Sequence, residues 1–184
     1  MQFDRAKLID LVHYVCATAD PGDLGAVKLH KILYFSDMLR YLDSGSPLTG
    51  ETYFKNKHGP TSRHLTQVLR TLTSQNKLSV ETKDYFGYPK RAFTSLEDPD
   101  MSKFSDAEIS LIDMVANFVC KKHTASSISE LSHNRAWELA EPGEDLPYFT
   151  AFQMVPVEPT EDDFNWAAEE ARKIADKRPP AKTV

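Results

Sequence analysis

The sequence has few cysteines and no long apolar run, and each shortage argues against a class of protein. Its two cysteines, Cys16 and Cys120, lie in separate apolar helical patterns rather than in a Cys-x-x-Cys spacing. We expect two buried free thiols, with a disulfide or a reactive thiol as the alternative. Asp4 and Arg5 interrupt the segment that a secretory signal would need, and no apolar run approaches the roughly 20 residues that cross a bilayer. We therefore expect a cytoplasmic protein without membrane insertion.

An excess of positive charge is also missing. The chain has 22 Lys and Arg against 27 Asp and Glu, which gives a formal net charge of -5. Proteins that bind the phosphate backbone of nucleic acids normally carry a surplus of Lys and Arg. Non-specific affinity for nucleic acid should therefore be weak, although a local basic patch stays open.

Motifs for catalysis, metal binding and phosphate binding are absent as well. The seven glycines form neither a P-loop nor a G-x-G-x-x-G pattern, and no Gly-x-Ser-x-Gly elbow occurs. His58 and His64 lie across a loop and a helix start, while His123 and His133 flank a helix, so no pair has the spacing of a metal site. We expect no catalytic residue, no metal, no cofactor and no enzymatic activity.

The sequence does contain strong helical periodicity. Asp4 is placed to cap a first helix that ends at Asp20-Pro21-Gly22, and a second helix runs from about Val27 to Leu42. This second helix is apolar on most sides, which is typical of a helix in the centre of a fold or under a partner. A third helix should begin at Pro60, and a fourth should follow the capping box of Ser105 and Glu108. The apolar faces of these two helices are formed by Leu65, Val68, Leu69 and Leu72, and by Leu111, Ile112, Val115, Phe118 and Val119.

Short β-segments complete the prediction. Residues 51–57 read as a short strand, and the alternating runs near Leu78 and Ala92 predict a β-hairpin that resembles a wing. Residues 124–140 read as two short helices broken near Ser132 and His133, and a last helix begins at Thr160. The expected fold class is mainly α (α+β), a compact helical domain with a short strand and a hairpin. The expected organisation is a domain over 1–156, a C-terminal helix over 157–177 that packs on it or extends it, and a disordered tail over 178–184.

Two features suggest contact surfaces. On the second helix Lys28, Lys31, Tyr34 and Asp37 recur every three residues and form a polar and aromatic stripe. The stripe is either the solvated face of the helix or a contact surface, with Tyr34 as an anchor and the lysines as steering charges.

The hairpin tip is the second feature. It crowds three aromatic residues, Tyr85, Phe86 and Tyr88, of which at least one should be exposed. Packing of the turn onto its own domain and a partner-binding patch are the two readings.

The order of elements also permits a winged-helix DNA reader. Residues 62–75 would be the recognition helix, offering Arg63, His64 and Arg70, and the hairpin would be the wing. The connection over residues 43–59 is far longer than a helix-turn-helix turn, and the chain is acidic overall. A transcriptional regulator therefore stays an alternative, and DNA is an unlikely main partner.

Five stretches together resemble the Panacea family, the domain of the SocA-like antitoxins. The stretches are KLHKILYFSDMLRY at 28–41, PLTGETYFKNKHGPTSRHL at 47–65, GYPKR at 87–91, ISELSHNRAWELAEPGEDLPYFTAF at 128–152 and PTEDDF at 159–164. The resemblance implies an antitoxin of a bacterial or phage toxin–antitoxin system that neutralises, by direct protein contact, a toxin encoded by an adjacent gene. Some relatives are thought to deliver the toxin to a protease. Others carry a separate helix-turn-helix domain, for which we expect no room before the first helix here.

The resemblance also supplies candidate residues. With the hairpin aromatics added, the toxin-binding candidates are Lys28, Lys31, Tyr34, Asp37, Tyr53, Tyr85, Phe86 and Tyr88. The positions assigned to the motif or the structure are Leu29, Gly50, Gly59, Pro60, Ser132, His133 and Trp137, and Thr49 is a further motif residue. Gly59-Pro60 in particular suits a corner between a strand and a helix, because Pro60 fixes φ and Gly59 permits an unusual backbone angle.

Overall fold

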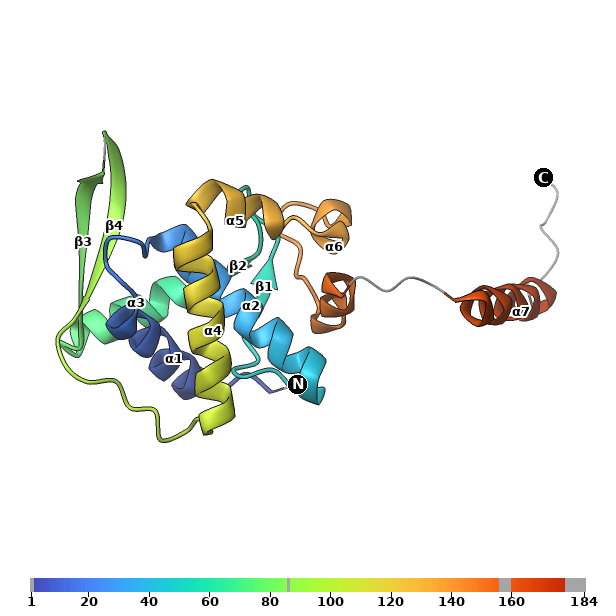
Figure 1. Ribbon diagram of the computed structural model, residues 1–184, viewed down its shortest axis with the longest axis horizontal. Coiled ribbons are helices and arrows are strands. Elements are labelled where there is room, and N and C mark those ends of the chain that lie inside the picture. The colour runs from blue at the N-terminus through green and yellow to red at the C-terminus, as the bar shows by residue number, and fades with distance from the viewer. Residues whose placement is uncertain (1, 86, 156–159, 178–184) are drawn as a thin grey trace. The chain divides into compact units, whose positions relative to one another are not determined.

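The computed structural model describes residues 2–85, 87–155 and 160–177 (Figure 1). The chain divides into two units, Met1–Met154 and Val155–Val184, and the second contains helix α7, Glu161–Lys177. The tail expected over residues 178–184 lies outside the described residues. Packing of the last helix on the domain, or its extension of the domain, stays a prediction.

Helix α2, Ala26–Ser44, is the central element of the first unit. Every residue from Ala26 to Leu42 is buried or half-buried, as the apolar character of this segment predicts. Helices α1 (Arg5–Thr18), α4 (Asp106–Lys122) and α5 (Ala125–Leu131) all pack against it, and α4 crosses it in Figure 1. The described residues are mainly helical with two small antiparallel sheets, so the predicted fold class is confirmed.

The predicted helix starts are correct at two places and wrong at a third. Asp4 accepts a hydrogen bond from Lys7 N, and Ser105 with Glu108 forms a complete capping box. Helix α3, however, spans Leu65–Ser74 and does not begin at Pro60. The two residues after Pro60 form strand β2, Thr61–Ser62, which pairs with β1, Tyr53–Phe54. The Ser62 hydroxyl then accepts a hydrogen bond from Leu65 N at 3.0 Å, which supports a later helix start.

The predicted hairpin is present. Strands β3 (Leu78–Tyr85) and β4 (Tyr88–Ser95) pair antiparallel, and Phe93 is buried in the core at the hairpin's base. At its tip Tyr88 is 76% exposed, which confirms the expectation of an exposed aromatic residue. Phe86 and the side chain of Tyr85 lie outside the described part of the structure.

The segment after α4 forms α5, then α6 (Arg135–Leu139), then a 3-10 helix, η1 (Tyr148–Met154). The break between α5 and α6 falls at Ser132 to Asn134, as predicted, whereas η1 was not expected. Both cysteines are free and buried. None of the helices among the described residues is long and apolar enough to span a membrane.

Candidate functional site

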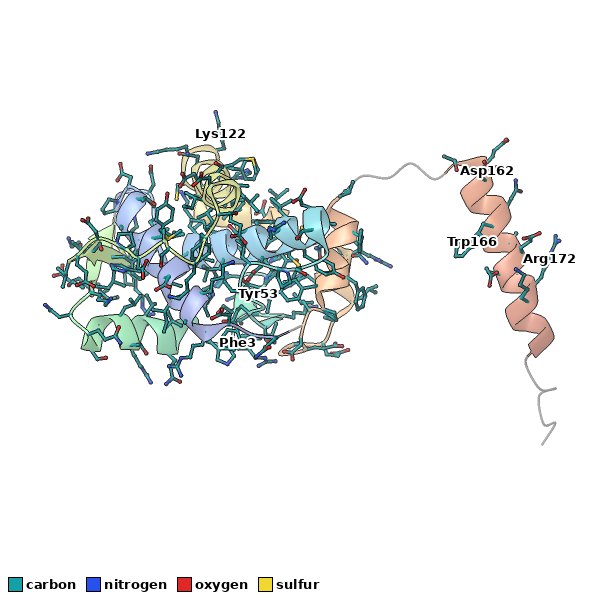
Figure 2. All side chains as sticks on the ribbon, turned by 90° about the horizontal axis from the view of Figure 1, so that it is seen from below. Phe3, Tyr53, Lys122, Asp162, Trp166 and Arg172 are labelled. Atoms are coloured by element: carbon teal, nitrogen blue, oxygen red, sulfur yellow. The ribbon has the colours of Figure 1, made fainter. Side chains whose placement is uncertain are left out.

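The stripe predicted on α2 does not lie on the surface. Lys28 and Lys31 are 8% and 1% exposed, and Tyr34 and Asp37 are fully buried. Figure 2 likewise shows Tyr53 inside the first unit, in contrast to Lys122, which points away at the end of α4. The expectation of an exposed stripe is therefore wrong, because other parts of the chain cover that side of α2. Any direct contact of these side chains with a partner stays a prediction.

Asp37 joins α2 to the loop that follows it. Its carboxylate accepts hydrogen bonds from the Thr49 amide, the Thr49 hydroxyl and the Tyr53 hydroxyl, each at 2.7 Å. Burial raises the pKa of Asp37, and these hydrogen bonds partly offset the rise. Burial and the neighbouring Asp37 charge together raise the pKa of Tyr53 well above its ordinary value. Three donors from Thr49 and Tyr53 thus fix the 49–53 segment to helix α2.

Glu51 is a second buried carboxylate that the sequence reasoning missed. Its Oε1 atom accepts hydrogen bonds from Thr52 N at 2.6 Å and pairs with His64 Nδ1 at 2.9 Å, while Oε2 has no partner among the described residues. The His64 ring in turn stacks on Phe3, with ring centroids 4.5 Å apart. The signal in the sequence that could have identified Glu51 was its position directly after the Thr49-Gly50 motif.

Lys31 and Gly59 are close-packed where the loop meets α5. Lys31 Nζ donates to Pro60 O at 2.8 Å, and burial lowers the pKa of Lys31 to about 7. Gly59 has a φ of +88°, and a Cβ there would lie 2.3 Å from Ser132 Oγ and 2.7 Å from Lys31 Nζ. Ser129 Oγ donates to His58 O at 2.7 Å from the same side. Gly59 is therefore packed closely against Ser132 and Lys31, and the role of Gly59-Pro60 and Ser132 in holding the fold stays a prediction.

Gly50, like Gly59, has a positive φ and no space for a side chain, because it packs against the N-terminal residues. Its φ is +69°, and a Cβ would lie 2.5 Å from Gln2 O.

We call Lys31, Asp37, Thr49, Glu51, Tyr53, Ser129 and Ser132 the buried polar network. Its members come from α2, the 49–53 segment, α5 and the C-cap residue of α5, Ser132, and they hold the 47–64 segment against the helices.

His133 and Trp137 form a stacked pair of rings beside the 55–57 segment. Their rings stack with centroids 3.7 Å apart and an interplanar angle of 6°. Trp137 Nε1 donates to Asn56 O at 3.2 Å, and Lys55 Nζ lies 4.5 Å from the centre of a Trp137 ring. The Ser-His-x-x-x-Trp pattern thus fastens α6 to the 55–57 segment.

A groove with an apolar lining lies on another face of the first unit, beside α4. It has a volume of about 510 Å³, and its polar lining residues, Asn134 and Gln153, carry no charge. The apolar lining residues are Phe35, Leu39, Met114, Val115, Phe118, Leu131 and Met154. Met114, Phe118 and Leu131 are exposed, and so are Phe149 and Phe152 on η1. We call this hollow the α4 groove; Phe118, expected in the core, lines it instead.

The arrangement offers little for metal chemistry. Among residues 2–85, 87–155 and 160–177, no group of three His, Cys, Asp or Glu side chains is placed to hold a metal ion.

The fold and the site define a class: a mainly helical domain in which a buried polar network holds a loop against one central helix. The family model for the SocA-like antitoxin, Panacea domain, matches residues 29–138, and the chain belongs to this family. The matched region runs from Leu29, just after the first turn of α2, into α6, so it contains the whole network and Trp137. No curated protein and no solved structure matches the chain.

Proposed function

We propose that this protein is an antitoxin that neutralises a cognate protein toxin by direct, stoichiometric contact. The observation that carries the proposal is the match to the SocA-like antitoxin family over residues 29–138. The toxin is the product of an adjacent gene, and both proteins act in the cytoplasm without turnover or cofactor. Delivery of the bound toxin to a protease would use the same contact.

The α4 groove is the surface that best suits this role. Three large apolar side chains, Met114, Phe118 and Leu131, are exposed around an uncharged hollow. Exposed apolar patches of this kind commonly mark binding sites for proteins, because burying them on association removes apolar area from water. The occupant would be an uncharged apolar segment of the toxin.

The hairpin stays a second contact, because Tyr88 is exposed at its tip. By contrast, Lys31, Tyr34, Asp37 and Tyr53 would act indirectly, by holding the frame on which the exposed side chains are displayed. The proposed interface thus differs from the α2 stripe that the sequence suggested.

Co-expression with the neighbouring gene product tests the proposal. The wild-type protein should restore growth of cells that produce the toxin, and Met114→Lys should weaken toxin binding about 30-fold and reduce the rescue. The matched control is Leu96→Lys, because Leu96 is 51% exposed and lies outside the groove, compared with 57% for Met114. Binding is measured by calorimetry on purified proteins.

Two results would count against the proposal at different levels. Failure of the soluble wild-type protein to bind or neutralise the toxin would exclude the antitoxin function. Equal loss in both variants, or in neither, would exclude the α4 groove alone. A DNA-reading regulator would instead bind its own promoter tightly and in a salt-sensitive manner without the toxin.

A further inference from the structure

A second cavity lies between the N-terminal end of α2, the start of β4 and the turn between α4 and α5. Its volume is about 640 Å³, and Tyr88 is the one lining residue that the proposed antitoxin contact also uses. Small apolar side chains and Pro89 form much of its wall, and Tyr88 adds an exposed aromatic ring. This size and lining are typical of cavities that bind small organic molecules.

Positive charge gathers in this cavity although the protein as a whole is acidic. Lys28, Lys90 and Arg91 line it, against a single lining carboxylate, Asp23, which already pairs with Lys121 at 2.7 Å. Lys28 is 8% exposed, and its ammonium group donates to Cys120 O at 3.0 Å. Within the described part of the chain, no carboxylate lies within ion-pair distance of Lys28. A charge so deeply buried normally has an anionic partner in direct contact, whereas Lys28 interacts with Asp23 only at longer range.

Lys90 is a second cation close to Lys28 in this cavity. Its amino group donates to the backbone carbonyls of Pro21 and Gly22, which ties the hairpin to the loop before α2. Burial and the nearby charge of Lys28 lower the pKa of Lys90, and the charges of Asp23 and Asp20 partly offset this shift. An anion bound beside Lys28 and Lys90 would reduce the repulsion that remains between them.

The backbone contributes to the same region. The N-cap of α2 is Gly25, which has no side chain, and no side chain caps this helix of 19 residues. The first N–H groups of a helix have no partner inside it and carry a partial positive charge. The residues of that first turn, Ala26, Val27 and Lys28, all line the cavity. The first turn of α2 and the cationic residues Lys28, Lys90 and Arg91 therefore meet at this cavity.

We propose that this cavity binds a small organic ligand that carries a phosphate group. The first-turn N–H groups of α2, together with Lys28 and Arg91, hold the phosphate. The apolar wall and the Tyr88 ring contact the rest of the molecule. Cations and a helix N-terminus together are a common arrangement for phosphate binding.

Calorimetry on the full chain tests the proposal with AMP, adenosine and inorganic phosphate as probes. AMP should bind at least about tenfold more tightly than adenosine, because the two differ only in the phosphate. AMP should also bind more tightly than inorganic phosphate, because only AMP reaches the apolar wall. Equal affinity for AMP and adenosine would overturn the phosphate site. Equal affinity for AMP and phosphate would overturn the role of the wall.

Two variants locate the site without threatening the fold. Arg91→Ala removes an exposed cation and should weaken AMP binding about tenfold. Ala26→Glu places a carboxylate at the N-terminus of α2, where acidic residues favour the helix, and should abolish AMP binding. Arg70→Ala is the matched control, because Arg70 is exposed on α3 and does not line the cavity. No binding of AMP or phosphate by the wild type, or wild-type affinity in both variants, would overturn the proposal.

Discussion

The buried polar network and the α4 groove reverse the usual distribution of polar and apolar side chains. In the network, Asp37, Glu51 and Lys31 lie inside the protein. Beside α4, Met114 and Phe118 are exposed to solvent. Both regions share α2, which contributes Lys31 and Asp37 to one and Phe35 and Leu39 to the other. Residues of the buried polar network hold the helices and the 47–64 segment together, whereas the exposed residues of the α4 groove are available to a partner.

The physical costs of the two regions differ accordingly. A buried polar group is tolerated when hydrogen bonds replace its lost water, and Asp37 has three such bonds. Exposed apolar side chains contribute little to folding, but they release about 25 cal/mol per Å² when a partner covers them. Substitutions in the network should therefore change stability, and substitutions in the groove should change binding.

Asp37→Ala should produce the largest loss of stability. It removes the acceptor of Thr49 N, Thr49 Oγ1 and Tyr53 OH, and it leaves buried donors unpaired. We expect the free energy of unfolding in urea to fall by about 3–5 kcal/mol. Two controls bracket this value. Ser36→Ala removes a buried hydroxyl without a partner in the described structure, and Met114→Ser changes the exposed groove, so each should cost less than about 1 kcal/mol.

The Asp37→Ala variant could also contradict the distinction between the network and the α4 groove. A fully stable Asp37→Ala protein that no longer binds the toxin would place the network at the interface. The division between frame and contact surface would then be wrong.

Gly59→Ala should have the next largest effect. Its Cβ would lie 2.3 Å from Ser132 Oγ at a φ of +88°, so both sterics and backbone conformation oppose the change. We expect a loss of about 2–4 kcal/mol in thermal or urea unfolding. Gly45→Ala has a similar φ, +72°, but no atom within 4 Å, so it should cost about 1 kcal/mol. Equal losses at the two glycines would show that close packing against Ser132 contributes nothing.

The smallest predicted effect concerns Lys31, whose titration should make the free energy of unfolding depend on pH. Its pKa in the folded protein is lowered to about 7 from an ordinary value of 10.5, so between these values the unfolded chain binds more protons than the folded one. Stability should therefore rise with pH across this window, by about 2 kcal/mol between pH 7 and 9. The rise should be absent in Lys31→Met, measured by urea unfolding at each pH. A parallel pH profile in the two proteins would mean that Lys31 stays charged in the interior.

Local signals in the sequence predicted much of the frame. The caps at Asp4 and Ser105, the periodic face of α3 and the alternation in β3 and β4 all depend on residues a few positions apart. The family motifs also identified most residues of the network, with Glu51 and Ser129 as the exceptions. Pro60 was misassigned because the pairing of Thr61–Ser62 with Tyr53–Phe54 competes with helix formation there, and periodicity cannot show such pairing.

The sequence by itself determined most of the helices, the hairpin and the family, because periodicity, capping and motif order are local properties of the chain. Only the tertiary structure decided which sides of these elements meet water. The stripe on α2 became interior because the 49–53 segment supplied partners for Asp37, and Phe118 is 44% exposed because the rest of the first unit leaves that side of α4 partly uncovered. Burial depends on residues distant in the chain, so spacing along one helix could not reveal it.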